Sequence, residues 1–361
     1  MGECKSTMIK LNFDVKKHIL DNGLEVLTIK KETQISSINV GIKVGALYEN
    51  INEKGISHFI EHMLFKGTKN RTFQRLNDEL EALGGEYNAY TDYSSTVYSV
   101  NCLEEELGNA INLLADMVTN SIFPQEEIKK ERGVILAEIR ASKDSVEDYS
   151  FKRTNEVAFN KSGLRYDVAG IDENIKKFQR KELIDFYNKY YIPSNALITM
   201  VSSLSHDEAI KEIINSFSEW TGENRIEFNI TDEKNKFVKE VSTKENIELS
   251  TIIYLFTFYE LEKKYELPLR ILNHRLGESS NSLLFREVRE NKGLAYDIYS
   301  HLDMTHNVKT LYIYTAVNEE DIDEASKAIE EILEGIKCGT IEIGTKDLNV
   351  MKKVKSMKHI I

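Results

Sequence analysis

Cysteine is scarce in this chain, which has only Cys4, Cys102 and Cys338 among its 361 residues. Their odd number and lack of paired spacing argue against a disulfide framework and a cysteine-based metal centre, and favour reduced thiols. The sequence also lacks any apolar run near the roughly 20 residues that a membrane-spanning helix needs, and its N-terminus lacks a signal-peptide core. We therefore expect a cytoplasmic protein that makes no membrane contact.

Basic residues are outnumbered as well, with 47 lysines and arginines against 59 aspartates and glutamates and a net charge of −12. This balance argues against a nucleic-acid partner, because such binding depends largely on neutralising phosphates. An acidic protein attracts basic peptides instead. A hydrophobic content of 41% and a charged content of 29% are typical of a soluble globular protein, and 361 residues exceed what one hydrophobic core usually serves.

The segment that carries chemistry is Gly55-Ile56-Ser57-His58-Phe59-Ile60-Glu61-His62. Two histidines four residues apart on a helix share one face and can bind one metal ion, and Glu61 lies near the same face. Zinc suits imidazole ligands, and a catalytic zinc keeps one position open for water and lowers its pKa to about 7. A neighbouring carboxylate can accept the proton of that water and return it to a leaving amine. His-x-x-Glu-His is the inverted zinc peptidase motif, although a surface helix with two ordinary histidines has the same pattern.

Catalytic zinc usually has three protein ligands, so a further donor must come from elsewhere in the chain. Glu138 is the best candidate because it interrupts the apolar run 134–139, where a buried carboxylate without compensation would be costly. Glu131 precedes it by two helical turns and so points the same way, where it could hydrogen-bond a ligand imidazole and fix its tautomer. For each glutamate taken alone, a solvated helix face is the alternative.

These residues resemble a known family, the pitrilysin and insulinase peptidases, especially the short bacterial members and the mitochondrial processing peptidase subunits. His58, Glu61 and His62 fit the inverted motif of that family, with Glu61 as the general base. Glu138 falls at the spacing of its distant third ligand, and Glu131 corresponds to its auxiliary glutamate. The resemblance therefore implies a zinc metalloendopeptidase with one Zn²⁺ ion per chain.

The resemblance also implies how a peptide substrate is held. Residues 84–91 resemble the family's strand beside the metal helix, along which substrate lies, and three of them are candidates for substrate contact: Asn88, Ala89 and Tyr90. A second domain closes over the first in the family and offers an arginine and a tyrosine, which Arg289 and Tyr296 match. A guanidinium or phenol aimed at the scissile carbonyl would stabilise the oxyanion, whereas without the resemblance core packing would be the default interpretation of Tyr296.

Local patterns predict two similar halves. The first should contain a hairpin over 17–29 that turns at Asn22-Gly23, a strand over 38–44, the metal helix, a helix over 72–82, a strand over 87–100 and a helix opened by Pro124. The second repeats strand, helix, helix and strand at 247–259, 265–276, 283–290 and after Gly293, without the metal ligands. We expect an α+β fold with two homologous domains, each an antiparallel-rich sheet layered with helices.

The polar segment 222–239 has little apolar periodicity and is the expected linker. It would join an N-terminal zinc-binding catalytic domain, residues 1–221, to a C-terminal substrate-contacting domain, residues 240–361. Two-domain relatives usually continue beyond the position of Ile361 by at least a helix and a strand. We therefore expect the second domain to be incomplete, either because the chain is shortened or because another subunit supplies the missing layer.

Two functions from different classes stay open. The first is a zinc endopeptidase that cuts extended or unfolded peptides inside a chamber closed by its two domains. The second is a non-catalytic partner or scaffold subunit, which the short C-terminus favours and the complete set of metal and base residues disfavours. The working form would be a homodimer or a heterodimer with a related chain. Other zinc hydrolases, such as amidases, fit the metal chemistry but not the second-domain resemblance.

Overall fold

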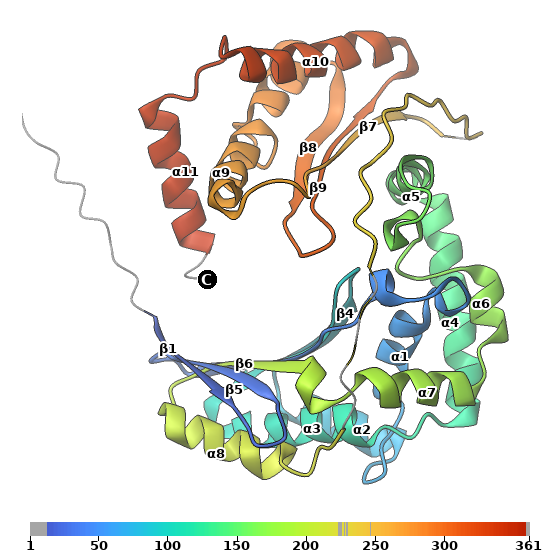
Figure 1. Ribbon diagram of the computed structural model, residues 1–361, viewed down its shortest axis with the longest axis vertical. Coiled ribbons are helices and arrows are strands. Elements are labelled where there is room, and N and C mark those ends of the chain that lie inside the picture. The colour runs from blue at the N-terminus through green and yellow to red at the C-terminus, as the bar shows by residue number, and fades with distance from the viewer. Residues whose placement is uncertain (1–12, 223–225, 227, 229, 246, 359–361) are drawn as a thin grey trace, which may run out of the picture. The chain divides into compact units, whose positions relative to one another are not determined.

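A computed structural model describes residues 13–222, 226, 228, 230–245 and 247–358 (Figure 1). The chain forms two compact units that each combine two stretches of sequence. The first unit contains Met1–Glu138 and Val168–Asn229, and the second contains Ile139–Asp167 and Ile230–Ile361. Each unit is described by itself below.

The first unit is built on a six-stranded sheet with the order β1-β2-β6-β3-β5-β4. Its strands are β1 (Asp14–Ile19), β2 (Glu25–Lys30), β3 (Ile35–Ile42), β4 (Glu86–Thr91), β5 (Thr96–Leu103) and β6 (Ala196–Ser202). β2 and β6 are parallel, and every other pair is antiparallel. The expected hairpin at Asn22-Gly23 is confirmed, with Gly23 at a φ of 87° that favours glycine.

The expected single strand over 87–100 is wrong, because β4 and β5 are two antiparallel strands joined by a tight turn. The Asp92 carboxylate accepts hydrogen bonds from the backbone N–H groups of Ser94 (2.6 Å) and Ser95 (2.7 Å). An aspartate that binds its own backbone two residues on stabilises a turn without glycine or proline. β4 is the last strand in the order and so lies at an edge of the sheet.

Helices cover one face of this sheet, since residues along β5 and β6 alternate between buried and half-buried. Figure 1 shows α3 and α8 lying against the sheet, and α1 packs on β4 and β5. The helices that begin in this unit are α1 (Ile56–Leu64), α2 (Phe73–Ala82), α3 (Leu107–Asn120), α4 (Gln125–Asp144), α6 (Asp172–Lys177), α7 (Arg180–Tyr190) and α8 (His206–Phe217). The expected helices over 72–82 and after Pro124 are confirmed as α2 and α4.

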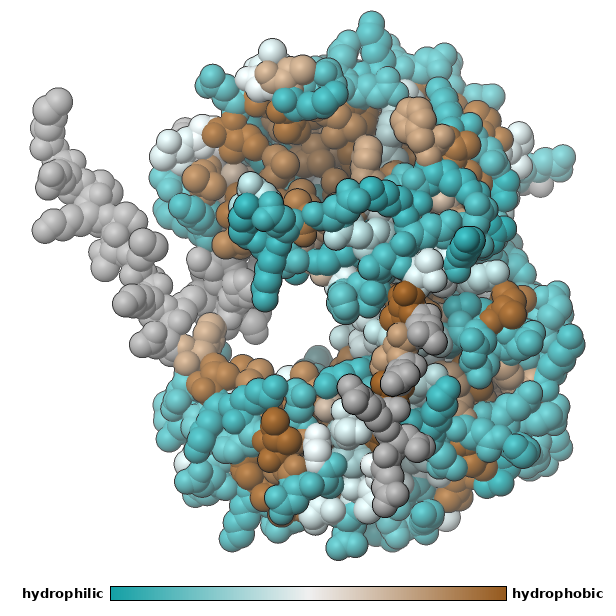
Figure 2. Space-filling model, viewed as in Figure 1, coloured by the Kyte–Doolittle hydropathy of each residue, from teal (hydrophilic) through white to brown (hydrophobic). Residues whose placement is uncertain are grey.

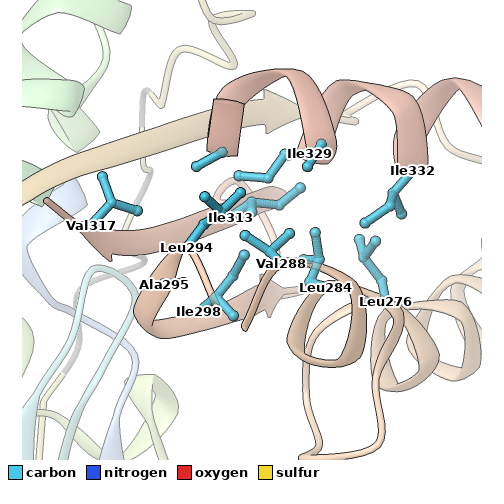
Figure 3. Packing of buried hydrophobic residues seen from close by; sticks show 12 residues of the cluster. Leu276, Leu284, Val288, Leu294, Ala295, Ile298, Ile313, Val317, Ile329 and Ile332 are labelled. Carbon is cyan, nitrogen blue, oxygen red and sulfur yellow. The ribbon is translucent and has the colours of Figure 1, made fainter. Parts of the chain in front are cut away.

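The second unit has a three-stranded antiparallel sheet with the order β7-β9-β8. Its elements are β7 (Ser250–Thr257), β8 (Ala295–Asp303), β9 (Thr310–Val317), α5 (Val146–Ala158), α9 (Glu266–Leu276), the π-helix η7 (Phe285–Asn291), α10 (Ile322–Cys338) and α11 (Thr345–Lys358). A hydrophobic cluster joins the sheet to the helices, as Figure 3 shows for Val288 of η7, Ile313 of β9 and Ile329 of α10. The helix expected over 283–290 is thus present: Leu283 and Leu284 are α-helical, and the helix continues as the π-helix η7.

Helix α5 packs on the face of the β7-β9-β8 sheet opposite the hydrophobic cluster. The two units therefore divide the chain at other positions than the expected boundary at residue 221. The Phe151 ring stacks on Tyr314, with the ring centroids 5.7 Å apart. Ser150 Oγ lies 2.7 Å from Thr251 Oγ1, and the Tyr312 hydroxyl donates to Asn155 Oδ1 at 2.7 Å. Residues 139–167 therefore belong with the second unit, although the segment Val168–Asn229 of the first unit follows them in sequence.

The α+β class, with an antiparallel-rich sheet layered with helices in each unit, is confirmed. Charged and polar side chains cover most of the face seen in Figure 2, where hydrophobic side chains gather below α10 in the second unit. Within the expected linker, residues 230–239 form neither helix nor strand. In the part of the chain that the structure describes, no helix has the length and apolar character needed to cross a membrane.

Candidate active site

The metal-binding residues predicted from the sequence come together between α1 and α4. His58 Nε2 and His62 Nε2 lie 3.9 and 3.6 Å from Glu138 Oε2. One ligand atom from each of the three residues lies within 4.8 Å of the other two. No other such group occurs among the described residues. Because donors around a tetrahedral zinc lie about 3.3 Å apart, this set needs only small side-chain adjustments to fit one ion.

Glu138 does reach the cluster, but the reason for which the sequence singled it out, burial among apolar neighbours, is wrong. Its side chain is 45% exposed, and Val134 in the same run is 44% exposed. Ile135 and Ile139 are buried on another side of α4. The apolar run therefore does not bury the carboxylate. Its distance from the two histidines, and not burial, identifies Glu138 as a candidate ligand.

Glu131 orders the imidazole of His62. The Nδ1–H of His62 donates to Glu131 Oε2 at 3.0 Å, which directs the Nε2 lone pair toward Glu138. Lys66 Nζ contacts the other oxygen of Glu131 at 2.9 Å, and the Glu131 side chain is only 9% exposed. Burial acts to raise the pKa of Glu131, but the bonds from His62 and Lys66 outweigh it and lower the pKa. Sequence reasoning proposed Glu131 and missed Lys66.

The two histidines have different protonation chemistry. Burial lowers the pKa of His58 to about 4, and the nearby His62 adds to this effect, so the His58 ring is neutral near pH 7. For His62, burial acts to lower the pKa, but the bond to Glu131 and the neighbouring carboxylates outweigh it and raise the pKa. A neutral imidazole is the form that binds a metal, so metal binding at His62 competes with its proton.

Glu61 lies beside the cluster without belonging to it. Thr91, the last residue of β4, donates a hydrogen bond of 2.6 Å from Oγ1 to Glu61 Oε2. Burial raises the pKa of Glu61, although the bond from Thr91 acts in the opposite direction. The sequence placed Thr91 in the strand beside the metal helix but did not single it out, because no local spacing relates it to Glu61.

The candidate substrate strand is exposed. Along β4 the side chains alternate between exposed and half-buried, and Tyr90 is 51% exposed. β4 pairs only with β5, so within the described residues its other edge has no strand partner. Asn88, Ala89 and Tyr90 therefore lie on a sheet edge whose backbone groups are open to a further strand.

Arg289 and Tyr296 belong to the second unit. Arg289 is in η7, where its guanidinium carbon lies 4.8 Å from the centroid of the Phe285 ring. Tyr296 is the second residue of β8 and its side chain is strongly exposed, at 73%. Such exposure argues against the core-packing alternative for Tyr296. The role of both residues toward the metal cluster remains a prediction.

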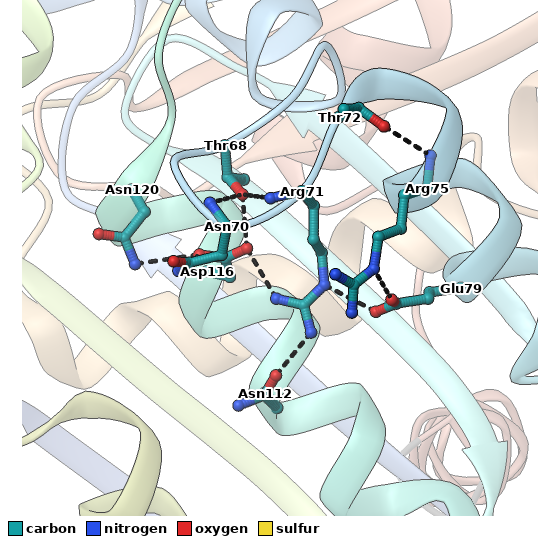
Figure 4. A network of polar contacts seen from close by, with 9 residues as sticks. All are labelled: Thr68, Asn70, Arg71, Thr72, Arg75, Glu79, Asn112, Asp116 and Asn120. Atoms are coloured by element: carbon teal, nitrogen blue, oxygen red, sulfur yellow. Dashed lines mark hydrogen bonds and ion pairs between the residues drawn. The ribbon is translucent and has the colours of Figure 1, made fainter.

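A second polar group in the first unit is structural (Figure 4). Asp116 on α3 is buried and accepts hydrogen bonds from Thr68, Asn70 and Arg71, and Arg71 also pairs with Glu79. Burial acts to raise the pKa of Asp116, but these bonds outweigh it and lower the pKa. The group lines a pocket of about 330 Å³, yet its buried charges satisfy one another. It ties the loop after α1 to α3.

Comparison with known proteins identifies related sequences along both halves of the chain. Residues 25–171 match the family described as insulinase (peptidase family M16), and residues 177–342 match the peptidase M16 inactive domain. An uncharacterized zinc protease of Rickettsia bellii (strain RML369-C) is 34% identical over 343 residues, which cover 92% of this chain and 81% of the relative. The uncharacterized zinc protease YmxG of Bacillus subtilis (strain 168) is 30% identical over 326 residues, with 90% and 78% covered.

More distant similarities extend the comparison. The mitochondrial-processing peptidase subunit beta of Bos taurus is 34% identical over 192 residues, which cover 53% of this chain and 39% of that subunit. The fold matches the crystal structure of a protease from Helicobacter pylori with a TM-score of 0.88 at 24% identity, covering 97% of this chain and 86% of the other. From its sequence relatives and the matches along both halves, the chain belongs to the insulinase family of peptidases, family M16.

Proposed function

We propose that this protein is a zinc-dependent endopeptidase in which His58, His62 and Glu138 hold one zinc ion per chain. The observation that carries the proposal is the cluster of three donor atoms from two helices, with Glu131 directing one imidazole toward it. When bound, zinc would supply Lewis acidity and a water molecule acidic enough to yield hydroxide near neutral pH. The names of the bacterial relatives, zinc proteases, support the choice of metal.

Glu61 is the proposed general base. Its carboxylate would accept the proton of the attacking water and return it to the leaving amine. Burial raises its pKa toward the working pH, which suits a group that must both accept and donate a proton. The hydrogen bond from Thr91 holds one carboxylate oxygen, so the other oxygen is left to face the water.

The substrate would be an extended peptide that adds to the edge of β4 at Asn88, Ala89 and Tyr90. Backbone pairing along a strand edge depends little on sequence, so side-chain pockets would supply only modest preference. Arg289 and Tyr296 would stabilise the oxyanion after the second domain closes over the first and completes a chamber. A folded protein cannot present an extended chain, so unfolded peptides are the expected substrate class.

The alternative is a non-catalytic partner or scaffold subunit. The relatives named as beta subunits of the mitochondrial-processing peptidase support pairing, here as a homodimer or with a related chain. The complete donor set and Glu61 favour catalysis over this alternative. The cytoplasmic location stays a prediction.

Metal analysis and peptide cleavage test the proposal together. We expect the wild type to contain one zinc ion per chain and to cleave an unstructured fluorogenic peptide. His58→Ala combined with His62→Ala should lose both zinc and cleavage, whereas His306→Ala, which alters an exposed histidine of the second unit, should retain both. Stoichiometric zinc in the double variant would refute the ligand assignment. Zinc without cleavage in the wild type would support the scaffold alternative.

A further inference from the structure

The two histidines of the proposed zinc site are supported in different ways. The ring of His62 is held by its hydrogen bond to Glu131. The Nδ1 atom of His58 is buried and has no hydrogen-bond partner among the residues that the structure describes. His58 is the third residue of α1, so its orientation depends on how the first turn of that helix is fixed.

Glu49 binds this first turn from the loop that precedes α1. Its Oε2 accepts a hydrogen bond from the backbone N–H of Gly55 at 2.9 Å, and its Oε1 accepts one from Ser57 at 2.8 Å. The first N–H groups of a helix have no acceptor within the helix, and Gly55 has no side chain to cap them. Burial raises the pKa of Glu49 to about 7 against the effect of these bonds, so above that pH its carboxylate also interacts favourably with the helix dipole. Glu49 thus caps α1 through the residue immediately before His58.

The surroundings of Glu49 are closely packed. Glu49 is 5% exposed and Lys54 is 2% exposed, with Lys54 Nζ donating to the carbonyl of Ala46 at 2.7 Å. Gly55 has a φ of 98°, and a Cβ at this position would lie 2.9 Å from the Cα of Gly170. The backbone before α1 therefore packs directly against the loop at Gly170. A change at Glu49 would move the start of α1, because the surrounding residues leave little free space.

We propose that Glu49 is a positioning residue for His58, serving the first metal-binding histidine through the helix backbone as Glu131 serves the second through its ring. This inference rests on the proposed zinc site. Burying a carboxylate costs free energy unless its oxygens accept hydrogen bonds. Both oxygens of Glu49 accept hydrogen bonds from the backbone at the start of the helix that carries His58. A purely structural role would change the stability of the fold without changing the geometry at the metal.

The test compares Glu49→Gln with Glu53→Gln. Glutamine keeps the shape of Glu49 but has only one acceptor oxygen, so one N–H of the first turn loses its partner. Glu53 is a matched control because it caps a neighbouring short helix in the same loop, where it accepts from the N–H of Asn50 at 3.0 Å. Among the described residues it makes no hydrogen bond or ion pair with α1. Zinc dissociation constants would be measured by chelator competition at pH 8, with circular dichroism of the metal-free proteins and visible spectra of the cobalt-substituted forms.

We expect Glu49→Gln to raise the zinc dissociation constant about 10- to 100-fold, as for other residues that orient metal ligands, and to shift the cobalt bands while the metal-free protein keeps its helix content. Glu53→Gln should change the constant less than 2-fold. If Glu49→Gln does not fold, Glu49→Asp, which keeps the charge but reaches only one N–H, should show a smaller loss of the same kind.

Unchanged zinc affinity and cobalt spectra in a folded Glu49 variant would overturn this inference alone. An equal loss in Glu53→Gln would do the same, because the effect would then belong to the loop in general. Absence of zinc from the wild type would instead overturn the proposed function, and this inference with it.

Discussion

Thr91 donates a hydrogen bond of 2.6 Å to Glu61, so the last residue of the edge strand β4 holds the proposed general base on the metal helix α1. The strand proposed to bind the peptide and the carboxylate proposed to activate water are thereby joined by one bond. A peptide paired along β4 would lie at a defined distance from the base. Under the proposed function, this contact would couple peptide binding to catalysis, and mutants of both residues test that coupling.

Glu61→Gln should keep zinc and lose catalysis. The amide preserves the shape of the carboxylate but cannot accept a proton, so kcat should fall at least about 10²-fold, the lower range for general-base catalysis. Peptide turnover and zinc content measured on the same preparation check this. Turnover close to that of the wild type would exclude Glu61 as the base.

Thr91→Val should move the pH profile of the enzyme. The bond from Thr91 lowers the pKa of Glu61 against the effect of burial, so removing the bond should raise that pKa further. Because the base must be ionised, the acidic limb of kcat/KM should shift to higher pH, with activity lost earlier as the pH falls. Thr199→Val, in β6 of the same sheet, is the control and should leave the profile in place. An unshifted limb in Thr91→Val would contradict the prediction.

Lys66→Met should weaken zinc binding by about 10-fold, because Lys66 keeps Glu131 charged and Glu131 orients His62. The folded-state pKa of Glu131 lies below its ordinary value, so its ion pairs stabilise the fold at neutral pH and are lost as the pH falls through that pKa. The variant should therefore lose less stability on acidification than the wild type. Lys69→Met removes an exposed lysine three residues away and is the control for chelator competition and thermal unfolding.

Tyr296→Phe should lower peptide turnover while zinc content stays the same, since only the hydroxyl offered to the oxyanion is removed. Tyr265→Phe, another exposed tyrosine of the second unit, should behave as the wild type. The same assay should show fast cleavage of an unfolded protein and slow cleavage of its stably folded form. Equal cleavage of the two forms would rule out binding by strand addition to β4.

Much of the local structure was predictable because it depends on neighbours in sequence. The four-residue spacing of His58 and His62 places both on one face of α1, and Thr72 caps α2, the helix expected over 72–82. The turn at Asp92 escaped prediction, since it contains neither glycine nor proline and is made by side-chain bonds to its own backbone.

The sequence by itself determined the metal motif, the family resemblance and several of the helices and strands, among them α2 and α4, because these follow from spacing along the chain. Only the tertiary structure decided which distant side chains complete the site. Thr91 reaches Glu61, Lys66 reaches Glu131 and Glu49 caps the helix of His58, each across a separation that no helical or strand period relates. It also decided that α5 packs with the second unit and that Glu138 is open to solvent. Contacts of this kind arise from packing between elements, which a local pattern does not specify.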